Sequence, residues 1–453
     1  MTANEKNSLF ETAKVTTIIR KFALPAIMSS LVGSVYNIVD QIFIGQKIGT
    51  LGNAATNVAF PLVMLMVTFS MTFGVGASSN FSMDIGSGNR ERAAKAVGNA
   101  LWYMIVSGTV LMIGTLAFLQ PLMLLFGARG QTLDYAVAYT GITAIGIPFY
   151  IVGTATAMLI RADGSPQYAM CATIAGAVLN TILDPVFLFV FDMGMEGAAL
   201  ATIIGQIVSA GISVCYLKKF QHIRLDRSSF QLSWQILKSV VALGLPSGSM
   251  QITVMLIQIV MNNTLGYYGD RSVYGRDIPL ACVGIISKIS TVFNSLISGI
   301  SQSCQPMIGY NYGAGNHRRV KETFWTAAKV VTAISAGAFL LFQVFPRQII
   351  SIFGNGSELY YEFGTRYLRI FLFCTFLSGI QILCANFFPA IGKAKLGMVC
   401  SLSRQVFFQL PLLLCFPLFW GMDGVLFAGP IADAMAAILS LSLVRFQLNS
   451  QDS

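Results

Sequence analysis

Long apolar segments, separated by short polar turns, run through almost the whole chain. A helix needs about 20 apolar residues to cross a bilayer core about 30 Å thick. The pattern predicts twelve such helices, near residues 19–44, 54–83, 93–118, 132–160, 167–191, 197–219, 237–264, 278–306, 320–344, 359–388, 396–420 and 424–447. Several of them contain glycine or proline, as tilted or kinked membrane helices do.

The second half of the chain repeats features of the first. The heptapeptide GSGNRER at residues 86–92 returns as GAGNHRR at 313–319, and GMEG at 194–197 returns as GMDG at 421–424, both at a spacing of 227 residues. A Leu-Pro pair that ends at Pro25 in the first predicted helix has a counterpart in the seventh. The matches indicate an internal repeat of six helices.

An even number of helices in each repeat fixes how the repeats are related. Both enter the membrane in the same direction, so a pseudo-two-fold axis along the membrane normal relates them. We therefore expect an all-α polytopic membrane protein with an N-terminal lobe of helices 1–6 (1–219), a cytoplasmic linker (220–236) and a C-terminal lobe of helices 7–12 (237–453). Transporters built this way work by alternating access, in which one lobe rocks against the other.

Composition and charge agree with this architecture. Hydrophobic residues make up 55% of the chain and charged residues 11%, against about 25% charged in a soluble domain. The net charge of +10 is explained by orientation, not by a nucleic-acid partner. Nineteen basic residues, from Lys6 to Arg445, fall on one side and five on the other, namely Lys47, Arg129, Arg271, Arg276 and Arg347.

By the positive-inside rule, both termini and the linker are cytoplasmic, and we expect a multi-pass protein of the cell membrane. The polar residues 1–17 lead straight into the first predicted helix, which is not the pattern of a cleavable signal peptide. His222 and His317 fall in predicted cytoplasmic loops, and we expect both to be ordinary surface residues.

Asp40, Asp184 and Asp433 are the acidic residues that lie well inside the predicted spans. An ionised carboxylate at such a position costs about 2.5 to 3.5 kcal/mol on insertion scales, so it suggests a functional site. From the helix rise, Asp40 lies about 6 Å, Asp184 about 10 Å and Thr202 about 8 Å from the outer ends of their helices. These polar groups share one layer in the outer half of the N-terminal lobe.

Neighbouring residues complete a candidate cation site. Asn180 lies one turn before Asp184 on the same helical face, and Pro185 disfavours a hydrogen bond to the carbonyl of Thr181. Carboxylate, amide, hydroxyl and carbonyl oxygens are ligands that a hard cation such as sodium prefers. They equally suit a proton shared between the two acids, because two close carboxylates in low dielectric cannot both be charged without cost. We predict cation coupling by Asp40, Asn180, Asp184 and Thr202, with no cofactor besides H⁺ or Na⁺.

A substrate cavity is expected beside this site. Tyr36 and Asn37 lie one turn below Asp40, and Met158 and Gln206 lie near the same cleft. Flexible and aromatic walls suit a promiscuous site, and buried carboxylates with aromatic faces favour organic cations. Pro25, in the same helix as Asp40, gives that helix a straight and a bent shape between which charge at Asp40 can select.

The second lobe offers Lys288 and Asp433 at similar depth. They form an ion pair or contact substrate, and the sequence leaves both possibilities open. Arg404 is expected to be a snorkelling side chain.

These features together resemble one family of transporters. The run QPMIGYNYGAGN at 305–316, Pro25 and Asp40 in the first span, the Asp184-Pro185 pair and the six-plus-six repeat resemble the multidrug and toxic compound extrusion (MATE) family. The resemblance implies an antiporter that exports organic cations and amphipathic drugs in exchange for protons or sodium. It also implies that Asp40, Asn180, Asp184 and Thr202 form the family's cation site in the first lobe. The acids that some members carry in helices 7 and 10 are missing from the corresponding stretches here, SGSMQITVMLIQIVMNN and YLRIFLFCTFLSGIQIL.

Other functions fit the sequence less well. No GxxxxGK[ST] loop is present for an ATP-driven pump, and the contexts IVDQ and ILDP differ from the YD and GxGD of an intramembrane aspartyl protease, so an enzyme is not expected. A passive channel is disfavoured by the two-lobe repeat. The alternative that stays open is a flippase for lipid-linked oligosaccharides or cell-wall precursors, which should have an arginine-rich cavity. We expect a monomer whose partners are small-molecule substrates and the lipid bilayer.

Overall fold

The structure is a computed structural model that describes residues 13–275, 277–352 and 357–450. Lys6 and Arg276, which the orientation prediction uses, lie outside the described residues. The first half of the chain contains α2 (Val15–Lys47), α3 (Thr50–Gly86), α4 (Arg90–Ala117), α5 (Leu119–Leu125), α6 (Gln131–Ala162), α7 (Pro166–Pro185), the π-helix η1 (Val186–Val190) and α8 (Gly194–Cys215).

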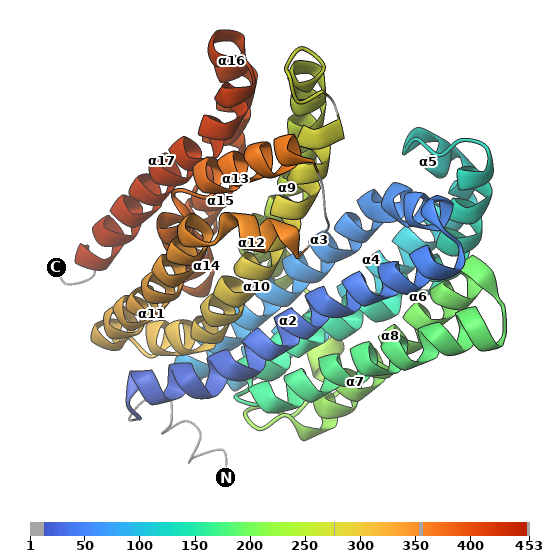
Figure 1. The fold of residues 1–453 in the computed structure, drawn as a ribbon. Coiled ribbons are helices and arrows are strands. Elements are labelled where there is room, and N and C mark those ends of the chain that lie inside the picture. Colours follow the sequence, from blue (N-terminus) through green and yellow to red (C-terminus); the bar gives the residue numbers. More distant parts are fainter. Residues whose placement is uncertain (1–12, 276, 353–356, 451–453) are drawn as a thin grey trace.

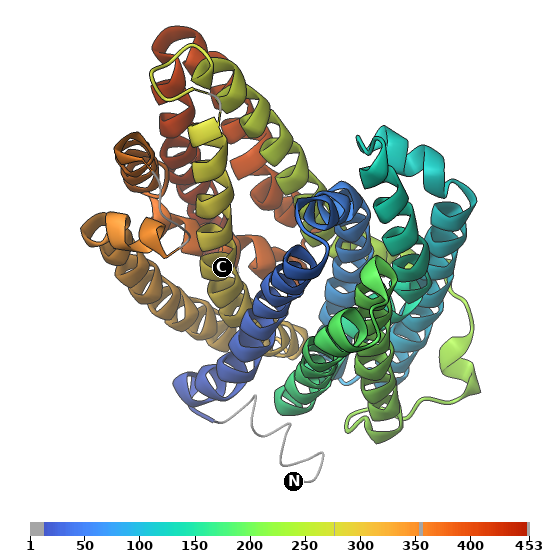
Figure 2. The ribbon, with the colours of Figure 1, turned by 45° about the vertical axis from the view of Figure 1, so that its right-hand side comes forward.

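Two short 3-10 helices, η2 (Tyr216–Lys219) and η3 (Arg227–Phe230), follow α8. The second half contains α9 (Trp234–Gly269), α10 (Asp277–Gly313), α11 (His317–Val344), α12 (Pro346–Ser351), α13 (Glu358–Phe371), α14 (Thr375–Ala390), α15 (Ala394–Leu402), the π-helix η4 (Ser403–Gln409), α16 (Leu410–Trp420) and α17 (Met422–Asn449). The two halves lie on opposite sides of the molecule, with the long helices α2 and α9 between them (Figures 1 and 2).

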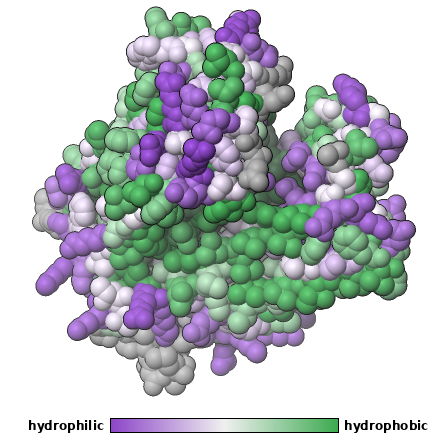
Figure 3. Space-filling view, viewed as in Figure 1, coloured by the Kyte–Doolittle hydropathy of each residue, from purple (hydrophilic) through white to green (hydrophobic). Residues whose placement is uncertain are grey.

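The predicted twelve-helix membrane fold is confirmed. In the described part of the chain, eleven helical segments are long and apolar enough to span a membrane, and α13 with α14 makes a twelfth span bent by 49°. The break in this span contains neither glycine nor proline, so no residue type there indicated it in advance. A hydrophobic belt crosses the middle of the molecule, and hydrophilic residues lie above and below it (Figure 3).

The repeated heptapeptides form the same turn in both halves. Gly88 and Gly315 have φ angles of 80° and 74°, a left-handed conformation that glycine adopts without strain. Each is followed by an N-cap asparagine, Asn89 for α4 and Asn316 for α11, whose side chain accepts a hydrogen bond of 3.1 Å from the backbone three residues later. The motif therefore recurs because it ends one long helix and caps the next.

The two halves share a hydrophobic core at only one end of the molecule. The largest core combines Phe22, Phe81 and Leu159 with Phe293 and Phe324 of the second half. Near the opposite end each half has a core of its own, one around Ile44 to Ala198 and the other around Ile257 to Ala428. Consistent with this difference, the surface is hollowed between the two halves at the end away from the start of α2 (Figure 3).

Backbone contacts hold the shared end together. A Cβ atom at Gly86 of α3 would overlap the carbonyl of Tyr310 in α10, and one at Gly313 of α10 would overlap the carbonyl of Met83 in α3. Each of these contacts is the counterpart of the other at the repeat spacing of 227 residues. The two helices thus cross on the pseudo-two-fold axis, as a self-complementary contact requires.

The connection after α8 differs from the prediction. His222 was expected at the surface, but it is only 4% exposed. Its Nδ1 lies 2.7 Å from Oδ1 of Asp163, which follows the end of α6, and its ring meets that of Phe81 edge-on. The prediction was wrong because the chain folds back onto the first half, and the sequence of the loop alone does not show this contact.

The close crossing of α3 and α9 can be tested by adding single methyl groups. A Cβ atom at Gly244 of α9 would overlap the carbonyl of Thr72, so we expect Gly244→Ala to destabilise the protein by about 1–3 kcal/mol through overpacking. Gly337→Ala in α11 is the matched control, because a Cβ atom there meets nothing within 4 Å and alanine favours the helix. Thermal unfolding in detergent measures both variants, and equal melting temperatures would contradict the predicted contact.

Candidate functional site

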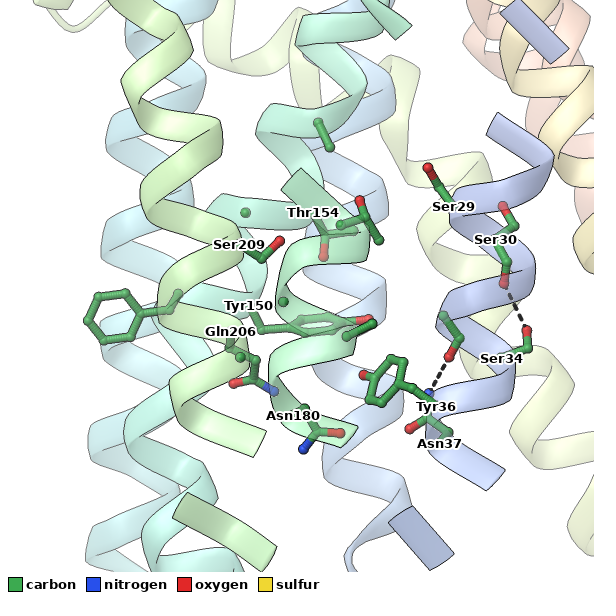
Figure 4. A pocket seen from close by; sticks show the side chains of 18 of the residues that line it. Ser29, Ser30, Ser34, Tyr36, Asn37, Tyr150, Thr154, Asn180, Gln206 and Ser209 are labelled. Atoms are coloured by element: carbon green, nitrogen blue, oxygen red, sulfur yellow. Dashed lines mark hydrogen bonds between the residues drawn. The ribbon is translucent and has the colours of Figure 1, made fainter. Parts of the chain in front are cut away.

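A cavity of about 350 Å³ lies between α2 and the helices α6, α7 and α8, with one residue, Gln302, contributed by α10. Tyr36 and Asn37 of α2 face Tyr150, Asn180 and Gln206 across it (Figure 4). On α2 the lining residues recur at three- and four-residue spacing, from Ser29 and Ser30 to Tyr36 and Asn37, so they form one helical face. The four cavity residues predicted in the first half, Tyr36, Asn37, Met158 and Gln206, all line this space.

Two glycines bring α7 and α8 together at the wall of the cavity. A Cβ atom at Gly176 would lie 2.6 Å from the carbonyl oxygen of Gly205, and the reverse contact has the same distance. Small residues at such a crossing let membrane helices approach closely. The approach places Asn180, one turn after Gly176, opposite Thr202, with Nδ2 of the amide 3.4 Å from the threonine hydroxyl.

The carboxyl groups of Asp40 on α2 and Asp184 on α7 are hydrogen-bonded to each other. Asp40 is 9% exposed and Asp184 is fully buried. Two ionised carboxylates repel each other at low dielectric, so a contact of this kind is favoured when a positive ion is shared between the two groups.

Asn180 completes the group by donating to Oδ1 of Asp184 at 3.4 Å. Three buried oxygens of the group, Oδ1 of Asp40, Oδ1 of Asn180 and Oδ2 of Asp184, have no hydrogen-bond partner within the protein. The common depth predicted for Asp40, Asp184 and Thr202 agrees with these contacts, and Asn180 lies with them, as its spacing from Asp184 predicts. Whether they couple transport to a cation stays a prediction, but unpartnered oxygens of this kind are available to a proton or to a hard cation.

Two tyrosines of α6 lie at the acid pair and at the cavity. Tyr139 is within electrostatic range of Asp40 and Asp184, and Tyr150 lines the cavity. Tyr36 lies near Tyr150 and Asp40. Neither Tyr139 nor Tyr150 was predicted from the sequence, although their spacing of eleven residues, three helical turns, puts them on one face of α6.

The two prolines are accommodated differently. α2 continues through Pro25, and the Ser29 hydroxyl donates a hydrogen bond of 2.9 Å to the Pro25 carbonyl. α7 ends at Pro185, and the chain goes on as the π-helix η1. A wider π turn is a common response to an interrupted helical hydrogen-bond pattern and is frequent at functional sites.

With this geometry established, comparison with known proteins gives the family. The MatE family model matches residues 25–186 and 246–414, one segment in each half of the chain. The chain belongs to the MatE family.

Relatives of known name agree with the assignment. The chain is 24% identical over 442 residues to the multidrug export protein MepA of Staphylococcus aureus strain MSSA476, covering 97% of this chain and 96% of MepA. It is similar to a solved structure of the MATE multidrug transporter DinF-BH, with 32% identity, a TM-score of 0.88 and 96% coverage of both chains. An outward-facing MATE transporter of the MOP superfamily matches with 22% identity, a TM-score of 0.91 and 99% coverage of both chains.

The second half departs from the predicted chemistry. Asp433 on α17 is paired with Arg404 on η4, whereas an ion pair with Lys288 or a substrate contact was expected. Lys288 on α10 is exposed, and the cavity beside α2 is lined by neither Lys288 nor Asp433. The snorkelling role predicted for Arg404 is also wrong. Arg404 lies in a π-helix, whose wider turn shifts side-chain directions from those of an α-helix, so helical counting does not place it.

Another basic residue was also misplaced by the sequence analysis. Arg161 was counted among the cytoplasmic loop residues, but it lies in the last turn of α6, is 8% exposed and lines the cavity. Its Nη2 donates a hydrogen bond of 3.3 Å to Oε1 of Gln302. The apolar residues before Arg161 continue to the end of the predicted span. The prediction therefore ended the span just before Arg161, and it did not show that this last helical turn faces the cavity.

The buried ion pair can be tested against an exposed one in the same half. We expect Arg404→Ala to destabilise the protein by about 3–5 kcal/mol, because it leaves the Asp433 carboxylate buried without a partner. Arg366→Ala removes a partner of Asp423 from a pair whose side chains are 46% and 37% exposed, and should change stability by about 0–1 kcal/mol. Thermal unfolding compares the two, and Asp433→Asn should restore part of the loss in the Arg404→Ala background.

Proposed function

We propose that the chain is a cation-coupled efflux transporter that exports organic cations and amphipathic drugs in exchange for protons or sodium ions. The observation that carries this proposal is the hydrogen-bonded pair Asp40 and Asp184, which lies next to a cavity with a polar and aromatic lining. A carboxyl pair in a membrane interior gains much from one positive charge. The names of the similar proteins, multidrug export protein and multidrug transporter, support the same activity.

The pair can respond to either coupling ion. A proton satisfies the contact between the two carboxyl groups directly, and a sodium ion would use the unpartnered oxygens of Asp40, Asn180 and Asp184 with the hydroxyl of Thr202. Loss of the ion leaves two negative charges that repel each other in low dielectric. The repulsion acts between α2 and α7, which both line the cavity, so ion binding and substrate binding are linked, and linkage is reciprocal.

Movement of α2 would convert this linkage into transport. Pro25 removes a backbone donor in the first part of the helix, and the cavity-lining residues of α2 lie between Pro25 and Asp40. Bending at Pro25 would therefore displace Tyr36 and Asn37 into or away from the cavity. The proposed cycle expels the drug when a cation occupies the acid pair and lets the drug rebind when the cation leaves.

Alternating access would use the asymmetry between the two ends of the molecule. The shared hydrophobic core closes one end, and the surface is hollowed at the other. With both termini cytoplasmic, as the charge bias predicts, the closed end faces the cytoplasm and the cavity opens outward. We place the protein in the cell membrane as a monomer.

The flippase alternative is less consistent with the cavity. A pyrophosphate-bearing lipid needs several basic groups, because its charge has to be matched inside a low-dielectric space. Among the described residues, the cavity lining contains one basic side chain, Arg161. Competition of dye binding by an undecaprenyl-type lipid would favour the flippase, and competition by protons or sodium would favour the exchanger.

The acid pair is tested by removing each charge. We expect Asp40→Asn and Asp184→Asn each to reduce efflux of a cationic dye from cells by at least about tenfold, since an amide cannot bind the coupling proton. Asp192→Asn is the matched control, because Asp192 is a 76% exposed partner of Lys47 near the end of η1. Full efflux by either buried-acid variant at equal membrane content would remove the pair from the mechanism.

The coupling ion is identified with purified protein in liposomes. An imposed pH gradient without sodium should drive dye movement if the pair shares a proton, and an imposed sodium gradient at equal pH should drive it if the oxygens bind sodium. We expect the pH gradient to drive transport, because the two carboxyl groups contact each other directly. Transport under the sodium gradient alone would reverse the assignment, and transport under neither would contradict cation coupling.

A further inference from the structure

Arg161 is an unusual residue for the wall of a cation-binding cavity. Its side chain is more than nine-tenths buried and still lines the cavity. A guanidinium group has five N–H donors and cannot lose its charge. One hydrogen bond, to Gln302, is formed with the described residues, so most of its donors are available to the cavity.

Among the described residues, no carboxylate pairs with Arg161. Asp84 and Asp433 form ion pairs with Arg92 and Arg404, and Asp163 contacts His222. The C-terminus of α6 supplies partial compensation through the helix dipole. A buried charge is otherwise costly unless it is paired, and the open space beside Arg161 is the cavity that it lines.

Gln302 adds further hydrogen-bond donors beside Arg161. Its Oε1 accepts the hydrogen bond from Arg161, which leaves its amide N–H groups free to donate. A second, much smaller space of about 10 Å³ lies beside Arg161 and is lined by Ser78, Gln302 and Gln305. This end of the cavity therefore offers hydrogen-bond donors and a positive charge, the chemistry that binds a carboxylate.

The internal repeat shows that the fold does not require an arginine here. Gly164 and Gly392 follow the ends of α6 and α14 with φ angles of 86° and 76°, so these two helix ends are counterparts. The residue that corresponds to Arg161 is Pro389, in the last turn of α14. The second half forms the same turn without a charged residue. The fold of this helix end therefore does not need the arginine.

We propose that Arg161 and Gln302 form an anion subsite at the inner end of the cavity, and that the preferred substrates are amphiphiles with a cationic aromatic part and a carboxylate. The proposal rests on the proposed efflux function and specifies its substrate class. Arg161 lies eleven residues from Tyr150 on α6, about 16 Å along the helix. The carboxylate of such a substrate lies at Arg161, and its cationic aromatic part extends from there toward the tyrosine and acid end of the cavity.

This arrangement also explains how a cavity that binds cations can contain the positive charge of Arg161. A purely cationic drug is repelled from the inner end and is confined to the region of Tyr36 and Asp40. A bipolar amphiphile instead matches both charges, because each lies at its own end of the space. The substrate's carboxylate then replaces the acidic partner that the chain does not supply.

The test uses two dyes that differ in one group. The ethyl ester of rhodamine 19 is purely cationic, and rhodamine 19 itself has a free carboxylate, which is ionised at pH 7.5. Fluorescence polarisation with the purified full chain in detergent gives the ratio of free-acid affinity to ester affinity. We expect Arg161→Gln to lower this ratio by about tenfold or more, since a hydrogen bond between two charged groups is lost.

Two further variants separate charge from geometry. Arg161→Lys keeps the charge but loses the forked donor arrangement, so it should lower the ratio by a smaller factor, and it serves if Arg161→Gln does not fold. Lys219→Gln removes an exposed positive charge outside the cavity and should leave the ratio unchanged. Melting temperatures establish that each variant is folded.

The possible results distinguish this inference from the function on which it rests. If the wild-type chain binds the ester and neither Arg161 variant lowers the ratio, the anion subsite is wrong while the efflux function stands. Equal weakening of both dyes assigns Arg161 a structural role and also overturns the subsite. If the wild-type chain binds neither dye, the proposed function fails and the subsite fails with it.

Discussion

The hydrogen bond between the carboxyl groups of Asp40 and Asp184 is the interaction on which the first half of the molecule depends. It joins α2, the helix between the two halves, to α7, which packs tightly against α8 through Gly176 and Gly205. Two buried acids can stay in contact only while a positive ion is shared between them. Under the proposed function, one small ion would shift the position of α2 relative to the rest of its half, and the lining of the cavity would move with it.

The internal repeat supplies one scaffold and uses it for two purposes. At the spacing of 227 residues, Gln206 of the cavity corresponds to Asp433. In the first half a neutral amide at this position lines the cavity. In the second half the same position holds one member of a buried ion pair. Such a pair is weak evidence for added stability, but it fixes the helices α17 and η4 against each other, so the two halves differ in what they can bind.

The sequence was sufficient for the fold and for the acid group, because both follow from regular helices. The length of an apolar segment gives a span, and counting residues from its outer end gives depth, which was enough to bring Asp40, Asp184 and Thr202 together. Counting residues along a helix did not predict side-chain positions where the backbone is not α-helical or where a loop folds back onto the protein. η4 turned Arg404 toward Asp433, the break between α13 and α14 has no local sequence marker, and His222 met Asp163 through a fold-back that no periodicity describes.

The positions of the charges explain how one cavity can both bind and release its ligand. The acid pair and Arg161 lie at opposite ends, so a change at the acids alters the attraction for a cationic group there without removing the attraction for an anionic group at Arg161. Because Arg161 lies beside Gln302 of α10, its surroundings belong to both halves. Any rearrangement that separates the halves at the closed end would break this hydrogen bond and dismantle the anion subsite. Under the proposed function, release of a bipolar ligand at one end and opening of the seal at the other would thus act on the same few residues, and such shared residues are what exchange of ligand for ion requires.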